Sequence, residues 1–340
     1  MRTLPRIMLL TCLLAVTCYA ICQAQDSRAI SFDKSWRFRK DTLTGAEHPQ
    51  YSDRDWKTLN LPHDWSIEDL PNQKEGEVQG PFTKSSAGKA ATGFTEGGIG
   101  WYRKTFTLNK ALIGKKTYIL FDGVYMDADV WINGHHLGNH PYGYTSFSYD
   151  LTTFLNPIGK PNVIAVRAKN IGKNSRWYSG SGIYRHVWLL PVNPLHTKLW
   201  GNYITTADAS KEKATVSVRT SVDNRSLQQK TVIVNLDLLN PSGQVVASQK
   251  QSLSIPADSS AELTQKLNII NPQLWGLDNP VLYKARVRLT LGSKTIDQTI
   301  TPFGIRSLIF DGQKGLQLNG KVVKLKGGCI HHDLGPLGSA

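Results

Sequence analysis

Three residues that can bind polar ligands stand together near the end of the chain, as His331, His332 and Asp333. They follow the apolar run 322–325, which is typical of a short strand, so the block would lie just beyond the end of that strand. An imidazole ring can donate a hydrogen bond to a hydroxyl group or accept one from it. A histidine pair that caps a turn, or one half of a metal site, explains the same residues, and taken alone the block favours these alternatives.

Cysteine usage limits the chemistry that the chain can carry out. Three of the four cysteines lie within the first 24 residues, so Cys329 alone remains if that segment is removed. A lone thiol forms no internal disulfide and cannot build a cysteine-based metal site, which needs several thiolates. No cofactor or metal-ligand cluster is evident in the sequence, so the fold must be stabilised by hydrophobic cores.

The segment 1–24 has the pattern of a secretory signal peptide. Two arginines precede the apolar stretch 7–21, small residues surround Ala24, and no acidic residue occurs before Asp26. The apolar stretch is short for a membrane-spanning helix, and the neighbours of Cys18 and Cys22 do not suit a lipid anchor. We therefore expect an exported protein, periplasmic or extracellular, with no integral membrane span.

The charge of the chain is basic but dispersed. The formal net charge is +14, a value that can indicate a nucleic-acid partner. The lysines and arginines are scattered singly, with no basic run longer than a pair, which is typical of the solvated faces of strands. We therefore expect no nucleic-acid partner.

Apolar and polar residues alternate with period two, the pattern of half-buried strands. The run 281–291 shows it most clearly, and 232–238 and 162–168 repeat it. Asn133-Gly134, Gly292-Ser293 and Asn319-Gly320 separate such runs, and these dipeptides favour tight hairpin turns. Helical periodicity is nearly absent. The chain after the signal segment is therefore predicted to be mainly antiparallel β, in sandwich-like units.

A composition change near residues 191–194 divides the chain. Seven of the nine tryptophans precede it, and a plainer alternation of Val, Leu, Thr and Ser follows. We expect one large sandwich over 25–192, an immunoglobulin-like sandwich of the usual size over 193–302, and the beginning of a third domain over 303–340. The polar segment 72–100 has no strand pattern, and the sequence does not separate a disordered excursion from a substrate-side lid.

A series of short blocks resembles glycoside hydrolase family 2, in order and over nearly all of the chain. In its sugar-binding domain the matching blocks are 61–65 (LPHDW), 100–106 (GWYRKTF), 121–124 (FDGV), 129–134 (DVWING) and 175–185 (SRWYSGSGIYR). Further along they are 272–275 (PQLW), 280–283 (PVLY), 303–306 (FGIR), 318–321 (LNGK) and 325–333 (LKGGCIHHD). The resemblance implies a jelly-roll-like sugar-binding sandwich, an immunoglobulin-like sandwich and the first strand of a (β/α)8 barrel.

The resemblance also implies a retaining glycosidase whose two catalytic carboxyl groups are glutamates on later barrel strands, the acid/base preceded by Asn. None of the seven glutamates follows Asn, and the only acids after Arg306 are Asp311 and Asp333. A barrel takes about 250 residues, and fewer than 40 follow residue 302. We therefore expect no catalytic residue in this chain, which would be inactive by itself. A divalent or monovalent cation would bind in the barrel.

The resemblance also implies which residues bind substrate, because they stand at positions that match substrate-binding positions of the family. His331 matches a histidine that approaches the hydroxyl groups of the −1 sugar, and His332 and Asp333 belong to the same block. Relatives often have Asn-Arg before this histidine where this chain has Cys-Ile, so no polar contact is expected there. Asn170 and Arg176 lie in segments that in the family reach over the barrel mouth. A stack on Trp177 or an ion pair is the competing explanation for Arg176.

Other candidates are better explained by structure than by chemistry. Asp64 is expected to form a turn. Trp101, Trp131 and Trp177 could stack on sugar rings, but most tryptophans in a sandwich belong to its core. The sequence thus predicts an exported glycosidase of terminal β-linked sugars, with β-galactosides as first choice and β-glucuronides or β-mannosides as alternatives. A non-catalytic carbohydrate-binding or adhesion module is the alternative class, and the sequence leaves a homo-oligomer open.

Overall fold

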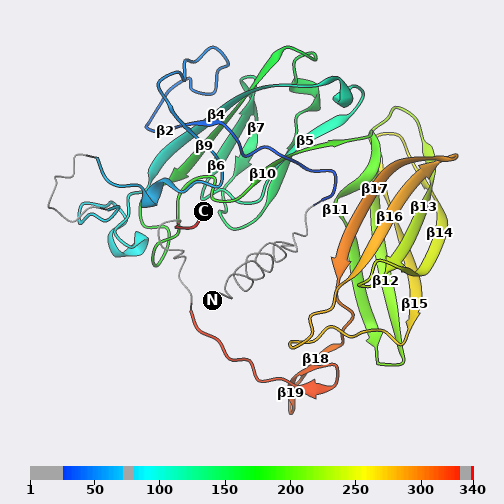
Figure 1. Ribbon diagram of the computed structural model, residues 1–340. Helices are drawn as coiled ribbons and strands as arrows, with labels where there is room; N and C mark the ends of the chain where they lie inside the picture. Colours follow the sequence, from blue (N-terminus) through cyan, green and yellow to red (C-terminus); the bar gives the residue numbers. More distant parts are fainter. Residues whose placement is uncertain (1–25, 72–79, 330–337) are drawn as a thin grey trace, which may run out of the picture.

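The computed structural model describes residues 26–71, 80–329 and 338–340, and its strands form two sandwiches that lie side by side (Figure 1). Every pairing between the strands of these sheets is antiparallel. The predicted fold class, mainly β with two successive sandwiches, is confirmed.

The first sandwich consists of a four-stranded and a six-stranded sheet. The smaller sheet has the order β1 (Ile30–Ser31), β10 (Val187–Val192), β5 (Lys116–Phe121) and β8 (Phe147–Asp150). The larger has the order β3 (Lys57–Leu59), β2 (Trp36–Lys40), β4 (Gly98–Thr107), β9 (Pro161–Asn170), β6 (Ala128–Ile132) and β7 (His135–His140). Four short 3-10 helices lie in its connections: η1 (Trp65–Ile67), η2 (Lys89–Thr92), η3 (Lys110–Leu112) and η4 (Thr152–Phe154).

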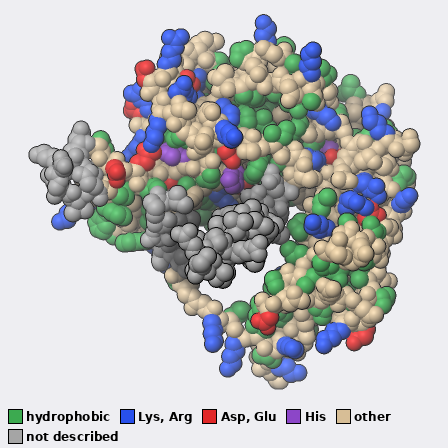
Figure 2. All heavy atoms as spheres, viewed as in Figure 1, with side chains coloured by type: hydrophobic (Ala, Val, Ile, Leu, Met, Phe, Trp, Pro, Cys, Tyr) green, Lys and Arg blue, Asp and Glu red, His purple; other side chains and the backbone are tan. Residues whose placement is uncertain are grey.

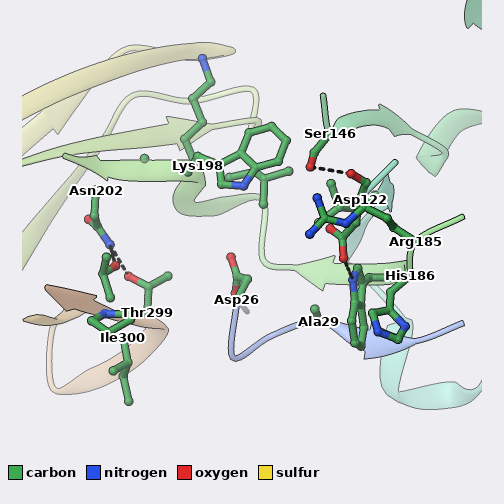
Figure 3. A pocket seen from close by; sticks show the side chains of 17 residues that line it. Asp26, Ala29, Asp122, Ser146, Arg185, His186, Lys198, Asn202, Thr299 and Ile300 are labelled. Atoms are coloured by element: carbon green, nitrogen blue, oxygen red, sulfur yellow. Dashed lines mark hydrogen bonds between the residues drawn. The ribbon is translucent and has the colours of Figure 1, made fainter. Parts of the chain in front are cut away.

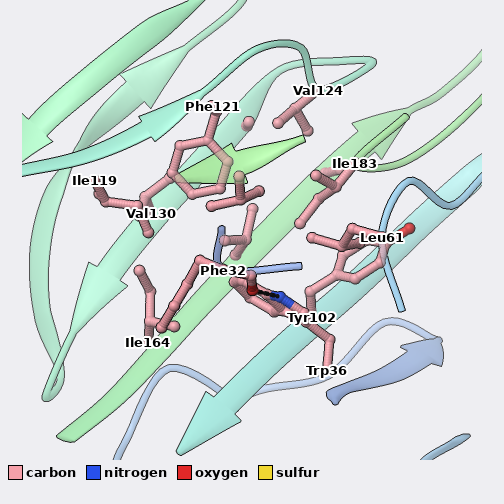
Figure 4. Packing of buried hydrophobic residues seen from close by; sticks show 14 of the residues in the cluster. Phe32, Trp36, Leu61, Tyr102, Ile119, Phe121, Val124, Val130, Ile164 and Ile183 are labelled. Atoms are coloured by element: carbon pink, nitrogen blue, oxygen red, sulfur yellow. Dashed lines mark hydrogen bonds between the residues drawn. The ribbon is translucent and has the colours of Figure 1, made fainter. Parts of the chain in front are cut away.

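The core of the first sandwich lies between its two sheets and is rich in aromatic rings (Figure 4). Trp36 and Tyr102 from the larger sheet and Phe121 from the smaller are fully buried. The indole nitrogen of Trp36 donates to the carbonyl oxygen of Phe32 at 2.9 Å, which satisfies its polar atom. Each large apolar side chain buried in this way contributes about 1.5–3 kcal/mol relative to an exposed one, so this core fixes the loops at the sandwich ends.

The second sandwich is built from longer and more regular strands. One sheet has the order β11 (Leu195–Ala209), β12 (Lys213–Asn224) and β15 (Ser259–Ile270). The other has the order β14 (Val245–Ile255), β13 (Lys230–Leu239), β16 (Tyr283–Leu291) and β17 (Lys294–Phe303). The alternation read along 281–291 is confirmed in β16, where every second side chain from Tyr283 to Leu289 is buried.

The hairpin turns follow the sequence signals. Asn133 and Gly134 join β6 to β7 with φ angles of 50° and 83°, the left-handed pair that a two-residue turn of this kind requires. Asn319 and Gly320 join β19 (Gly315–Leu318) to β20 (Lys321–Val322) in the same way, with φ angles of 50° and 76°. Strand β18 (Leu308–Asp311) completes this small third sheet.

The strand predicted over 322–325 is shorter than expected. Strand β20 ends at Val322, and residues 323–329 form no strand, although the N–H of Val323 still donates to the Leu316 carbonyl oxygen of β19 at 2.8 Å. No described strand pairs with them beyond β19, and a strand without a neighbour leaves its backbone groups unpaired. A barrel strand is therefore not seen in the described residues, and the following 330–337 lie outside them.

The two sandwiches are joined by a buried ion pair as well as by the chain. Strand β10 runs almost directly into β11, and Arg28 lies beside this junction. The Arg28 guanidinium bonds Asp26 at 2.5 Å, the Thr197 carbonyl oxygen at 2.8 Å and Asp297 of β17 at 3.1 Å. The Arg28 and Asp297 side chains are only 9% and 5% exposed, so this network connects the first sandwich to the second with little competition from water.

Candidate functional site

Loops from distant parts of the sequence meet at one end of the first sandwich, where the last residues of the chain also lie (Figure 1). They are the segment 61–68, the folded part of the long loop at 80–97, the connection 170–182 and residues 338–340. Two residues that the family resemblance predicts to bind substrate, Asn170 and Arg176, lie in these loops. We call them the end loops.

Asp64 holds the end loops together. Its carboxylate is 3% exposed and acts as the N-cap of η1, accepting from the backbone N–H of Ser66 at 2.9 Å. The same oxygen accepts from the N–H of Ser181 at 2.9 Å. The other oxygen accepts from the Tyr178 hydroxyl, and from Ser339 N–H at 3.2 Å. The turn-forming role expected of Asp64 is confirmed, and it extends to segments far away in the sequence.

Tyr178 is a proton donor within this network. Burial raises the pKa of its hydroxyl, and the adjacent Asp64 carboxylate raises it further. The phenol therefore stays protonated at all physiological pH values and continues to donate to Asp64. This arrangement positions the connection 170–182, but the phenol cannot serve as a base near neutral pH.

A second pair of groups, His63 and Glu68, lies beside this network. The Nε2 of His63 donates to Glu68 Oε1 at 2.9 Å, and its Nδ1 is 2.8 Å from the Tyr102 hydroxyl. Lys57 donates to the same carboxylate at 2.5 Å. Burial by itself would raise the pKa of Glu68, but the bonds from His63 and Lys57 lower it to about 2. A carboxyl group with this pKa is ionised near neutral pH and does not supply a proton as a general acid.

We expect the Glu68 contacts to stabilise the fold only above acidic pH. The folded-state pKa of about 2 lies below the ordinary value of 4.5, so the stabilisation is complete above pH 4.5 and is lost as the pH falls towards 2. Glu68→Gln should therefore lower the melting temperature at pH 7, and the gap between the two proteins should close between pH 4.5 and 2. Thermal melts across this range, with Glu262→Gln as an exposed control, would check it; a gap independent of pH would contradict it.

Asn170 is a structural part of the end loops. It is 4% exposed, and its amide donates to the Gly180 carbonyl oxygen at 3.1 Å and to Ser181 Oγ at 2.7 Å. Its side-chain oxygen accepts from Asn174 at 2.5 Å. These contacts fix the two ends of the connection 170–182 against each other. Contact between Asn170 and a sugar stays a prediction.

Arg176 and Trp177 are the solvent-facing residues of the same connection. Arg176 is exposed and makes no ion pair or hydrogen bond within the described ranges, and none of the cation–π contacts found there joins it to Trp177. The Trp177 side chain is 46% exposed, whereas Trp101 is 1% exposed and stacks on Trp131 at 5.4 Å. Of the three tryptophans considered as platforms, Trp177 therefore has the most accessible ring. A substrate role for Arg176 stays a prediction.

The long loop is folded where the structure describes it. Phe82 bridges to Thr95, and the buried hydroxyl of Ser86 donates to the Thr95 carbonyl oxygen at 2.6 Å around η2. Gly97 lies so close to the connection 170–182 that an added Cβ would stand 2.1 Å from the Asn170 carbonyl oxygen. The segment 80–97 is thus packed against the connection 170–182, and its Phe94 side chain is 38% exposed. Residues 72–79 lie outside the described part.

The remaining predicted site residues cannot be placed. His331, His332 and Asp333 fall within 330–337, outside the described residues, so their contact with sugar stays a prediction.

Among the residues that are described, no group of three or more His, Cys, Asp or Glu side chains is arranged to hold a metal ion. No described helix is long and apolar enough to cross a membrane. Figure 2 shows lysines and arginines spread singly over the visible face.

The end loops are therefore one connected unit at the end of the first sandwich. They offer buried hydrogen-bond networks that fix backbone, and exposed aromatic and basic side chains, but no free pair of carboxyl groups among the described residues of these loops.

Comparison with known proteins identifies the family. Residues 30–193 match the family model "Glycosyl hydrolases family 2, sugar binding domain", and residues 198–306 match "Glycosyl hydrolases family 2". The chain belongs to glycoside hydrolase family 2. A beta-galactosidase of Bacteroides ovatus, BoGH2A, is 43% identical over 310 residues, which cover 91% of this chain and 35% of that protein.

Other relatives agree on the family. A putative beta-glucuronidase of Formosa agariphila is 39% identical over 97% of this chain and 30% of its own length. The crystal structure of a family 2 member from Bacteroides cellulosilyticus superposes with a TM-score of 0.86 at 44% identity, covering 92% of this chain and 40% of that one. The chain thus spans about a third of the length of the two sequence relatives.

Proposed function

We propose that the chain is the substrate-recognising, non-catalytic front part of an exported, retaining family 2 glycosidase that acts on terminal β-linked sugars. The observation that carries the proposal is the pair of matches to family models, in order, over both sandwiches. The end loops would then lie towards the sugar, with Arg176 and Trp177 as their accessible contacts and His331, His332 and Asp333 as contacts from the segment that follows β20.

β-Galactosides are the first candidate substrates. The support is the 43% identity with the beta-galactosidase of Bacteroides ovatus, and relatives called beta-glucuronidase make glucuronides the second candidate; β-mannosides are a third, implied by the family. The test is to assay the product of the whole reading frame that carries this chain on nitrophenyl β-galactoside, β-glucuronide and β-mannoside. We expect kcat/KM to be at least tenfold higher for the galactoside, and a larger value for either other sugar would overturn this choice.

We expect the 340-residue chain alone to show no measurable hydrolysis of these substrates. Retention requires an acid with a raised pKa and a second carboxylate about 5–5.5 Å away. The described glutamates offer neither. Glu68 has a pKa of about 2. Glu47, Glu96 and Glu262 pair with His48, Lys40 and Arg219, and Glu212 accepts from the Ser210 hydroxyl. Turnover by a pure preparation that disappears on replacing one of the chain's own acids would contradict this expectation and favour a complete enzyme.

A non-catalytic carbohydrate-binding or adhesion module remains the rival class. The codons that follow residue 340 in the source reading frame distinguish the two. We expect them to encode alternating strands and helices with an Asn-Glu pair and a later second Glu, as a barrel with two catalytic carboxyl groups requires. A stop codon or an unrelated domain there would favour the module.

Export is a separate element of the proposal. It is supported by the basic, apolar and small-residue pattern of residues 1–24, which lie outside the described residues. Expressed from its own start in a bacterium with two membranes, the protein should be found outside the cytoplasm with its N-terminus near Gln25. Mass spectrometry of the intact product would check this, and a cytoplasmic product that keeps Met1 would contradict it.

A further inference from the structure

A cleft of about 590 Å³ lies between the two sandwiches, away from the end loops. Figure 3 shows Asp122, Ser146 and Arg185 on one wall and Asn202, Thr299 and Ile300 on the other, with Asp26 between them. The first wall belongs to the first sandwich and the second wall to β11 and β17 of the second. Its volume falls in the range of about 300–1,000 Å³ that is typical of small-ligand pockets.

Trp200 is held at this cleft by an irregularity in β11. The pairing of β11 with β12 shifts between Thr197 and Asn202, so the intervening residues bulge out of the sheet. Trp200 adopts a left-handed backbone conformation with φ of 55°, and its side chain is 63% exposed. This conformation costs a non-glycine residue about 1–2 kcal/mol. Such strain is concentrated at functional sites, because elsewhere it brings no compensating gain.

The next residue shows that the bulge is specific to this sequence. A Cβ at Gly201 would stand 2.7 Å from the Lys198 carbonyl oxygen and 2.9 Å from the Ser221 carbonyl oxygen. A side chain at Gly201 would therefore collide with the backbone of β11 and β12, so the close approach of the chain at the bulge requires a glycine next to Trp200. A rigid, exposed indole offers a large flat apolar face, which is the surface that the C–H groups of a pyranose ring stack upon.

Arg185 brings a positive charge to the same cleft. It is exposed, and it makes no hydrogen bond or ion pair within the described part of the chain. Of the two acidic residues that line the cleft, Asp26 pairs with Arg28, and Asp122 accepts a hydrogen bond from the neutral indole nitrogen of Trp188 at 2.8 Å. Lys198, at the rim, is likewise exposed and unpaired among the described residues. Arg185 and Lys198 are therefore available to an anionic group, for which a guanidinium is a bidentate partner.

The two walls are held in place before any ligand arrives. The buried Arg28 network connects Asp26 on the cleft floor with Thr197, next to the bulge, and with Asp297, two residues before Thr299. A preformed cleft loses little conformational freedom on binding, so even a few contacts can give useful affinity.

We infer that this cleft is a second carbohydrate-binding site, which takes an oligosaccharide bearing a carboxylate or sulfate group. Trp200 is its stacking platform and Arg185 the partner of the anion. The site needs no catalytic carboxyl group, so it is independent of the hydrolysis proposed above. It would keep the protein on an acidic glycan while the end loops engage the sugar to be cleaved.

The test is calorimetric titration of the 340-residue chain with three hexasaccharides: an oligogalacturonate, a sulfated chondroitin fragment and neutral cellohexaose. We expect at least one anionic ligand to bind tenfold more tightly than cellohexaose, and the advantage to shrink between 0.05 M and 0.5 M NaCl because salt screens the charge. The two anionic ligands distinguish carboxylate from sulfate, and tighter binding of either supports the site.

Affinity measurements on variants would show whether the ligand binds in the cleft. Trp200→Ala should weaken the preferred ligand at least tenfold, Trp200→Phe should recover most of this loss, and Arg185→Gln should reduce the preference over cellohexaose to less than threefold. Phe310→Ala, which removes a ring that is 77% exposed on β18, should change the affinity less than twofold. Circular dichroism and melting temperatures would verify that each variant is folded.

Three results would overturn the inference. One is the absence of binding to any of the three ligands, and another is an unchanged affinity in the folded Trp200→Ala variant. The third is binding that is lost in Trp177→Ala but kept in Trp200→Ala, which would move the ligand to the end loops. The proposed hydrolysis is tested by turnover of nitrophenyl glycosides, so its failure would leave these results unaffected.

Discussion

Arg28→Met should reduce the free energy of unfolding by about 3–5 kcal/mol, because removing one partner of a buried ion pair leaves the other charge uncompensated. The uncompensated group is Asp297, whose side chain is 5% exposed. Since Arg28 also bonds the Thr197 carbonyl oxygen at 2.8 Å, its loss should loosen the junction between the sandwiches. We expect the two sandwiches of the unchanged protein to unfold in a single thermal transition. In Arg28→Met they should unfold in two separate transitions, which calorimetry would resolve.

Two further variants test whether the loss of stability comes from the buried ion pair. Arg39→Met removes an ion pair with Asp41 whose side chains are 46% and 42% exposed, and exposed pairs contribute only about 0–1 kcal/mol. Arg28→Met combined with Asp297→Asn should be less destabilised than the sum of the single variants, because the pair is removed together. If Arg28→Met melts like Arg39→Met, the network does not couple the domains.

The regular part of the fold was predictable because its signals are local. The alternation in β16 and the Asn133-Gly134 turn each depend on a few adjacent residues, and each predicted its element correctly. A half-buried strand needs one apolar face, and a two-residue hairpin turn needs residues that tolerate positive φ. Such requirements can be read without knowing which strands become neighbours.

The interactions that shape the binding surfaces were not predictable in the same way. Asp64 accepts from Tyr178, Ser181 and Ser339, which lie more than 110 positions away along the chain. The sequence pattern indicated a turn at Asp64 but carried no information about these partners. The network of Arg28 with Asp297 is equally distant. Interactions of this kind depend on how the loops and domains pack, which periodicity does not report.

The bulge at Trp200 has a weak signal in the sequence. Residues 195–209 were interpreted as part of a plain alternation, whereas the structure has a bulge between Thr197 and Asn202. A glycine inside a strand pattern often marks a bulge or a close backbone approach, and Gly201 directly after a tryptophan is such a case. The pattern could have located the irregularity, but not the cleft that it borders, because the opposite wall comes from another domain.

Asp64→Ala should destabilise the first sandwich by about 3 kcal/mol, since hydrogen bonds to a charged group contribute about 1.5–3 kcal/mol each and buried donors would lose their acceptor. The donors affected include the backbone N–H groups of Ser66 and Ser181 and the hydroxyl of Tyr178. Amide hydrogen exchange should become faster in 64–68 and 170–182, while strands in the core such as β4 and β9 keep most of their protection. Asp64→Asn should fall between the two proteins, because its amide keeps only one accepting oxygen.

The matched control for Asp64 is Asp150, which also accepts a hydrogen bond from a backbone N–H at the start of a short 3-10 helix, η4. Asp150 accepts from the backbone N–H of Thr152 at 2.8 Å, but its side chain is 41% exposed, so water can replace the lost contacts. Asp150→Ala should therefore cost only about 0.5–1.5 kcal/mol, the net effect of losing a hydrogen bond, and should leave exchange in 170–182 unchanged. Equal destabilisation by the two substitutions, without faster exchange in 170–182, would show that Asp64 only caps η1 and does not hold the end loops together.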